Sequence, residues 1–213
     1  AIGQVWRISN NLQVDVQHNP LNCQGGYSIF GHSILTIHLN DSPGERMSIQ
    51  IATLGGGCFW CLEAAYARID GVISVKSGYA GGHMSNPSYE QVCDETTGHA
   101  EVVQIEFDSE TIDFATVLEI FFVIHDPTSL NRQGADIGTR YRSVILYADQ
   151  EQQAIAAAMI RELEASGQWG QPIVTEVVPL EAFYDAEGYH QDYYVNHQQQ
   201  PYCQIVIAPK LAK

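Results

Sequence analysis

Hydrophobic positions along residues 48–178 follow two different spacings, and each spacing predicts a kind of element. Alternation of apolar and polar residues, or a short continuous apolar run, is typical of a strand, whereas spacings of three and four are typical of a helix. By these rules we expect strands at 49–54, 72–80, 100–107, 142–147 and 173–178, and helices at 59–69, 114–122 and 149–165. Residues that favour turns separate most of these segments.

The order of these elements predicts the fold class. Two strand–helix–strand passes follow one another, which indicates an α+β protein with a ferredoxin-like open sheet and helices packed on one face. The Gly-, Asn- and Pro-rich segment 81–96 forms a loop long enough to have a functional role. From Phe183 onward the chain is rich in Tyr, Gln and His, which predicts a long loop-rich C-terminal tail that ends in an extended piece at 205–207.

Residues 1–46 sustain neither spacing. Short apolar pieces such as 34–37 alternate there with polar and turn-forming clusters. Such pieces bury little surface to offset the entropy of ordering the chain. We therefore predict an N-terminal extension at 1–46, either a small hairpin or a poorly packed arm, and a functional domain at 47–213.

Charge and cysteine content narrow the function classes. The chain has 10 Lys and Arg residues against 25 Asp and Glu residues, a formal net charge of −15, which disfavours nucleic acid and anionic membranes as partners. No segment approaches the roughly eighteen apolar residues of a membrane span, and no signal peptide is recognisable at the start. We expect a soluble, cytoplasmic monomer. Its five cysteines are an odd number, too few for a disulfide framework, and no Cys and His spacing predicts a metal site.

Cys58 lies at the junction between the first expected strand and the first expected helix. Three glycines, 55–57, join the first strand to the first helix, and Cys58 follows them directly. Glycines leave space beside the sulfur, and the unpaired first amides of a helix give it a partly positive surrounding. This favours a thiolate and makes Cys58 the candidate nucleophile, although most free cysteines are buried structural thiols.

Residues 57–60, Gly-Cys-Phe-Trp, resemble the signature of the A-class peptide-methionine sulfoxide reductases. Six more segments resemble that family in its order: 78–82, 86–93, 97–101, 125–127, 138–143 and 189–191. The resemblance covers about 47–213, and it marks this part as a methionine sulfoxide reductase catalytic domain. It implies thiol-dependent reduction of the S epimer of methionine sulfoxide, in oxidised proteins or as the free amino acid. It also implies a cysteine sulfenic acid, an intramolecular disulfide, no bound cofactor, and thioredoxin (dithiothreitol in vitro) as reductant.

The same resemblance suggests which groups hold and protonate the sulfoxide oxygen, namely Glu101, Tyr89 and Tyr141. Glu101 shares the parity of Val103 and Ile105 and should point to the apolar face of its strand. Desolvation there would raise its pKa and keep a proton available near neutral pH. The alternatives are a solvated strand residue for Glu101 and ordinary half-buried rings for the two tyrosines.

Substrate binding is expected from aromatic residues. Adjacent helix residues face different directions, so Phe59 and Trp60 cannot both enter one core, and we interpret them as the pocket for the methyl thioether. The resemblance adds Tyr193, Tyr202 and Asp136 as further candidates for substrate binding. The transfer to Asp136 is weaker, because the preceding residue is Ala where the family more often has Asn.

The disulfide partner of Cys58 has two candidates. Cys203 in the tail resembles the resolving cysteine of the family, whereas Cys61 lies one helical turn from Cys58 and would need local distortion to form a disulfide. We predict a principal Cys58–Cys203 disulfide with Cys61 as a secondary or relay partner, and resting thiols at Cys23 and Cys93. Two other functions stay open: a thioredoxin-like thiol–disulfide oxidoreductase using Cys58 and Cys61, and a non-enzymatic redox sensor.

Overall fold

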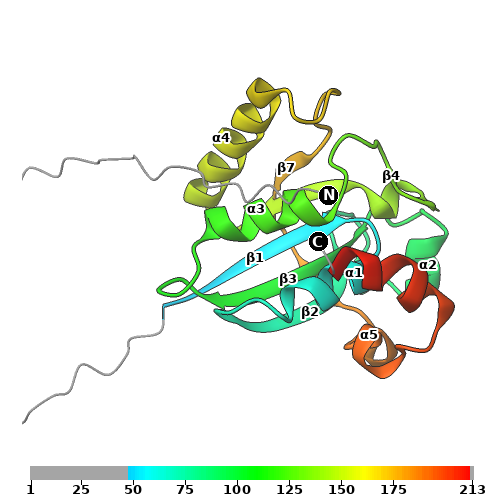
Figure 1. The fold of residues 1–213 in the computed structure, drawn as a ribbon. Helices are drawn as coiled ribbons and strands as arrows, with labels where there is room; N and C mark the ends of the chain where they lie inside the picture. The colour runs from blue at the N-terminus through cyan, green and yellow to red at the C-terminus, as the bar shows by residue number, and fades with distance from the viewer. Residues whose placement is uncertain (1–47, 212–213) are drawn as a thin grey trace, which may run out of the picture. The chain divides into compact units, whose positions relative to one another are not determined.

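A six-stranded mixed sheet organises residues 48–211, the part of the chain that the computed structural model describes (Figure 1). Strand β1 (Ile49–Gly56) lies between β3 (Ala100–Asp108) and β6 (Ser143–Tyr147), and β2 (Val72–Ala80) lies outside β3. All three of these pairings are antiparallel, with Leu54 opposite Val103 on one side and Ile145 on the other. This strand order and direction are those of a ferredoxin-like core, so the predicted α+β fold is confirmed.

Two further strands extend the sheet at its edges. Strand β7 (Glu176–Pro179) pairs in parallel with β6, and β8 (Phe183–Asp185) pairs in antiparallel with β2. The chain between them therefore runs from one edge of the sheet to the other. It brings Leu180 onto a small apolar cluster of the second face, made of Ala80, Ala100, Val102, Val144 and Leu146.

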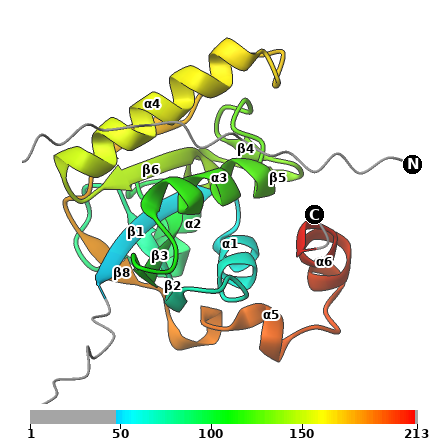
Figure 2. The same ribbon diagram turned by 60° about the vertical axis from the view of Figure 1, so that its left-hand side comes forward.

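Helices α1 (Phe59–Tyr66), α3 (Phe114–Ile124) and α4 (Gln150–Ser166) cover the other face, as Figures 1 and 2 show. The main hydrophobic core lies between these helices and the sheet. Helix α3 supplies buried residues at helical spacing: Phe114, Val117, Leu118, Phe121, Phe122 and Ile124. Each fully buried side chain of this size contributes about 1.5–3 kcal/mol, so the core fixes where β1 and α1 meet. Within residues 48–211 no helix combines the length and apolar composition that a bilayer crossing requires.

Helix ends follow the chemistry of their sequences. Asp113 and Asp149 each accept a hydrogen bond from a backbone N–H in the first turn of α3 and α4, at 2.7 and 2.8 Å. Helix α4 ends at Gly167, which adopts the left-handed conformation that glycine accommodates without strain.

The C-terminal tail differs from its prediction at one point. Residues 205–207 are not extended: they belong to a π-helical turn at Cys203–Ile207 that continues into α6 (Ala208–Leu211). Three consecutive apolar residues are compatible with a strand or a helix. Here a helical turn buries both Cys203 and Ile207, which are four positions apart. The rest of the tail is loop-rich, with the short helix α5 (Tyr193–Asn196).

The structure adds small elements that the sequence pattern did not predict. They are β8, helix α2 (Tyr89–Cys93) and the two-stranded ribbon of β4 (Arg132–Gln133) and β5 (Asp136–Ile137). The predicted extension 1–46 and its Cys23 lie outside the described residues, so that prediction stays a prediction.

Candidate active site

The turn between β1 and α1 is closed tightly by neighbouring elements. A Cβ atom on Gly55 would lie 2.8 Å from a methyl carbon of Val144, and one on Gly57 would lie 2.6 Å from the side chain of Gln133. Gly57 also has a φ of +94°, which L side chains rarely adopt. The glycines thus make room for the protein's own atoms, and they place Cys58 at the start of α1 with only 5% of its surface exposed.

Glu101 reaches the same helix start from the neighbouring strand β3. Its side chain is 2% exposed, and its Oε2 accepts a hydrogen bond of 3.1 Å from the Phe59 backbone N–H. Burial raises the pKa of Glu101 to about 8, although the Phe59 N–H and the Arg140 charge act in the opposite direction. The carboxyl group therefore keeps its proton at neutral pH and can donate it beside Cys58.

The protonation of Cys58 differs from the sequence prediction. Burial, reinforced by a hydrogen bond with Cys61 and by the charge of Glu101, raises the pKa of the Cys58 thiol well above its ordinary value. The first helix amide does not stabilise a thiolate directly, because the Phe59 N–H is bonded to Glu101 and not to the sulfur. The pKa of Cys61 is lowered to about 7, because the Cys58 thiol donates a hydrogen bond to it and Lys210 lies close. The prediction of a Cys58 thiolate is thus wrong for the substrate-free protein.

Tyr89 and Tyr141 approach the carboxyl group of Glu101 from two loops. Tyr89 begins α2, and Tyr141 ends a short helical turn, Thr139–Tyr141. Both rings are half-buried, and burial together with the charge of Glu101 raises the pKa of Tyr89 and that of Tyr141, the latter to about 12. Both hydroxyls stay protonated at neutral pH and can donate hydrogen bonds to an oxygen beside Glu101.

Phe59 and Trp60 take different positions, as their adjacency on a helix requires. Phe59 is 1% exposed and packs against Tyr79 at a ring distance of 5.9 Å, within the core. Trp60 is half-buried, and its ring stacks on Tyr193 at 3.6 Å and 6°. The ring of Tyr202 is nearly perpendicular to that of Trp60, and the two ring centres are 5.8 Å apart. The tail thus supplies two of the aromatic rings around α1.

The tail also brings its polar groups and Cys203 to the site. Helix α5, the π-helical turn and α6 all contact α1, and they lie beside it in both ribbon views (Figures 1 and 2). The Tyr202 hydroxyl donates a hydrogen bond of 2.8 Å to Asp136 Oδ2, and it lies close enough to Cys58 to lower the pKa of that thiol. Cys203 is completely buried, and burial together with the charge of Cys61 raises its pKa. All site residues predicted from the sequence therefore lie at this end of α1.

Comparison with known proteins identifies the family. Residues 50–213 match the family model described as peptide methionine sulfoxide reductase. MsrA from Saccharolobus solfataricus is 61% identical over 165 residues, which cover 78% of this chain and 92% of that protein. MsrA from Sulfolobus acidocaldarius is 57% identical, with coverage of 78% and 93%. The chain belongs to the peptide methionine sulfoxide reductase family. It is therefore an oxidoreductase that reduces methionine sulfoxide.

Solved structures agree with this assignment. Reduced Mxr1 from Saccharomyces cerevisiae superposes with a TM-score of 0.69 at 34% identity, covering 75% of this chain and 94% of Mxr1. Methionine sulfoxide reductase A of Corynebacterium diphtheriae gives a TM-score of 0.65 at 32% identity, with coverage of 71% and 76%. The relatives match the part of the reductase that contains the fold and the site.

Three residues of the reductase site, two of them buried, were not singled out as site residues from the sequence. Glu63, on α1, accepts hydrogen bonds from the tail. His190 is 2% exposed between Phe59 and Tyr89, at ring distances of 5.0 and 4.4 Å, and neither ring nitrogen has a hydrogen-bond partner. Gln191 bonds the backbone of β2 at Ser77 in both directions. For His190 and Gln191, the segment 189–191 was the available signal.

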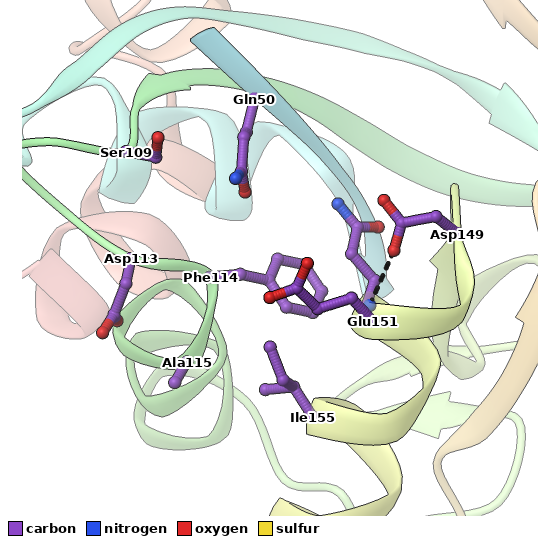
Figure 3. Close-up of a pocket in the computed structure, with 9 residues that line it drawn as sticks. Gln50, Ser109, Asp113, Phe114, Ala115, Asp149, Glu151 and Ile155 are labelled. Atoms are coloured by element: carbon purple, nitrogen blue, oxygen red, sulfur yellow. Dashed lines mark hydrogen bonds between the residues drawn. The ribbon is translucent and has the colours of Figure 1, made fainter. Parts of the chain in front are cut away.

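Two other features lie apart from this chemistry. A cavity of about 350 Å³ opens between the first turns of α3 and α4, with Asp113, Asp149 and Glu151 around Phe114 and Ile155 (Figure 3). None of the predicted site residues lines it. In the part of the chain that the structure describes, no three His, Cys, Asp or Glu side chains converge on a point that could hold a metal ion.

Proposed function

We propose that this enzyme reduces the S epimer of methionine sulfoxide, in oxidised proteins and as the free amino acid, with Cys58 as the nucleophile. The observation that carries the proposal is the pairing of Cys58 with Glu101, a buried carboxyl group whose pKa of about 8 keeps it protonated at neutral pH. A sulfoxide oxygen becomes a leaving or migrating group only when it is protonated, so a nucleophile needs such an acid at its side.

In the first step, the sulfur of Cys58 attacks the sulfoxide sulfur. Glu101 delivers its proton to the oxygen and takes up the proton that Cys58 releases, and Tyr89 and Tyr141 donate hydrogen bonds to that oxygen. The oxygen ends on Cys58 as a sulfenic acid, and methionine leaves with the electron pair that completes its sulfide. The thiol is oxidised by two electrons and the sulfoxide is reduced by two, so no bound cofactor takes part.

Substrate binding is assigned to the aromatic wall beside Cys58. Trp60 offers its ring surface to a methyl group and a sulfur, which contact aromatic edges favourably. Phe59 is buried in this structure and supports Trp60 from the core, at a ring distance of 6.1 Å. Tyr193 and Tyr202 complete this wall from the tail, and Asp136 orients Tyr202 through their hydrogen bond. An apolar pocket with few polar groups selects a small thioether end and leaves the rest of a peptide outside.

The second step removes the sulfenic acid. The Cys203 thiol attacks the Cys58 sulfur, water leaves, and an intramolecular disulfide forms. Cys61 lies beside both sulfurs and is the secondary or relay partner. Thioredoxin then reduces the disulfide through two thiols, as the resemblance to the family implies, and dithiothreitol replaces it in vitro. Such a cycle suits a monomeric enzyme in a reducing compartment such as the cytoplasm.

The test is turnover of the separated sulfoxide epimers with dithiothreitol. The wild-type enzyme should consume the S epimer only, and Cys58→Ser should lose turnover by at least about a thousandfold, because an alcohol is not a nucleophile at this pH. Circular dichroism should show the variant folded. Turnover retained in Cys58→Ser, or consumption of the R epimer, would sink this proposal.

One observation favours a second function. The lowered pKa of Cys61, about 7, suits a thioredoxin-like pair with Cys58. However, disulfide reductants present one sulfur to a bulky partner, whereas Cys58 and Cys61 are 5% and 3% exposed. Reduction of insulin disulfides at the rate of sulfoxide turnover would favour the thiol–disulfide oxidoreductase.

A further inference from the structure

Glu63 is a buried carboxylate that the chemistry above does not use. It lies on α1 and is 3% exposed. Its Oε1 accepts hydrogen bonds from the Ser77 hydroxyl and the Asp192 backbone N–H, both at 3.1 Å, and its Oε2 accepts one from the Tyr193 backbone N–H at 3.2 Å. Burial raises the pKa of Glu63, and these hydrogen bonds offset part of the cost of burying its charge.

Two of these donors belong to the start of α5 in the tail. Asp192 precedes the helix with a φ of +53°, and its own side chain makes no capping bond. The first amides of α5 are therefore satisfied by Glu63, a side chain 129 positions earlier in the chain. A carboxylate on the nucleophile-bearing helix thus holds the backbone of Asp192 and Tyr193 in place.

The side chain of Tyr193 is held by the same helix. Its ring stacks on Trp60 at 3.6 Å, and Trp60 precedes Glu63 by one helical turn. The ring also stacks on His197, at 4.3 Å. Backbone and ring are thereby fixed to one face of α1, which leaves Tyr193 little freedom as long as both contacts persist.

We propose that Glu63 is a positioning residue: its carboxylate clamps the start of α5, holds Tyr193 over Trp60, and so fixes one wall of the sulfoxide pocket. The last part rests on the proposed function, because it takes Trp60 and Tyr193 as substrate-binding residues.

The clamp requires a carboxylate and not just a side chain of this shape. All three partners of Glu63 are donors, and both of its oxygens accept. Glutamine has the same length, but its NH₂ group would face an N–H or O–H donor. Glu63→Gln should therefore open the clamp without leaving a cavity. Ser77→Ala is the matched control, because it removes one bond to Glu63 and keeps both tail amides in place.

The first experiment tests the clamp in the substrate-free protein through the fluorescence of Trp60. Trp60 is one of three tryptophans, so replacing Trp6 and Trp169 by Phe makes it the only fluorophore of its kind. In that background, Glu63→Gln should shift the emission to the red and raise acrylamide quenching about twofold, toward the values of Tyr193→Ala. Ser77→Ala should match the parent. Unchanged emission and quenching in Glu63→Gln would overturn the proposal.

If that variant does not fold, hydrogen exchange of the wild-type enzyme tests the clamp. Slow exchange at the amides of residues 192 and 193 supports the clamp, and exchange as fast as in a loop overturns it.

The second experiment links the clamp to the pocket. In single turnovers, Glu63→Gln should raise the half-saturating sulfoxide concentration about tenfold and change the limiting rate by less than about twofold, because Cys58 and Glu101 are untouched. A fall in the limiting rate alone, or an unchanged half-saturation, would overturn this link. Trp60→Ala separates the two proposals. If it leaves half-saturation unchanged, the pocket assignment fails, whereas the clamp is still judged by the fluorescence of the substrate-free protein.

Discussion

Cys58 and Cys203 belong to two regions of the enzyme that are built in different ways. Cys58 sits where β1, β3 and α1 meet, and side chains of the hydrophobic core such as Leu54, Leu62 and Val103 fix that junction. Cys203 comes with a tail that is held on the same core by polar side chains and stacked rings, including Glu63, Gln191 and Trp60. Apolar packing keeps the region around Cys58 in one geometry through the reaction. The few hydrogen bonds that hold the tail can instead be replaced by hydrogen bonds to water.

This difference matches the two kinds of chemistry that the proposal requires. Sulfoxide reduction needs a nucleophile and an acid in fixed positions, and both come from the core-built region. Disulfide formation needs a second sulfur to approach the first, and exchange with thioredoxin needs that disulfide to become accessible. A tail that is docked but not embedded can do both, so we expect its contacts to break before those of the core.

The largest effect is expected from Glu101→Gln in the core-built region. The amide keeps the shape of the side chain but has no acidic proton, so formation of the sulfenic acid should slow by about 10²–10⁴-fold in single turnovers. In the wild-type enzyme this rate should fall as pH rises through about 8, the pKa of Glu101, because the acid is then ionised. That alkaline limb should vanish in Glu101→Gln. An unchanged rate would return Glu101 to a structural role.

Stability provides the control for that variant. The pKa of Glu101 in the folded protein is about 8, above the ordinary 4.5, so the folded state holds the proton more tightly than the unfolded state. Tighter proton binding by the folded state stabilises the protein. This stabilisation is fully present below pH 4.5, and it is lost as pH rises through about 8. Glu101→Gln buries no charge and should melt no lower than wild type at pH 8.5.

A change in the tail should separate the two steps. Cys203→Ser should form one methionine per enzyme at the wild-type rate but lose most thioredoxin-dependent turnover, about tenfold or more, because its sulfenic acid lacks the principal resolving thiol. Mass mapping of wild-type enzyme after one equivalent of sulfoxide should find Cys58 joined to Cys203. Full turnover in Cys203→Ser, with Cys58 joined only to Cys61, would assign the resolving role to the helix cysteine.

The smallest effect is expected from removal of residues 1–46. The family match begins at residue 50, and the pattern of the first 46 residues predicts little buried surface. A chain beginning at Met47 should keep sulfoxide turnover within about twofold and its melting temperature within a few degrees. A large drop in melting temperature would show that the extension packs on the core.

The sequence predicts these two regions unequally. Periodicity located β1, α1 and β3, and parity placed Glu101 on a buried face, because burial of one side of an element leaves a repeating pattern. Docking of the tail leaves no repeating pattern in the sequence. It depends on bonds such as those between the Gln191 side chain and the backbone of Ser77, 114 positions apart, and in the sequence Gln191 looks like an ordinary polar residue. The protonation of Cys58 was mispredicted for a similar reason, since only the structure shows that Glu101 takes the first helix amide.

The burial and protonation of Cys58 bear on how the enzyme survives the conditions that create its substrate. Hydrogen peroxide attacks thiolates, and repeated attack leads to sulfinic and sulfonic acids that thiols do not reverse. A neutral sulfur covered by Tyr202 offers peroxide little nucleophilic character and little access. In the proposed mechanism, sulfoxide in contrast is held by an aromatic wall and receives a proton from Glu101. Burial thereby limits the access of peroxide to Cys58 in the resting enzyme.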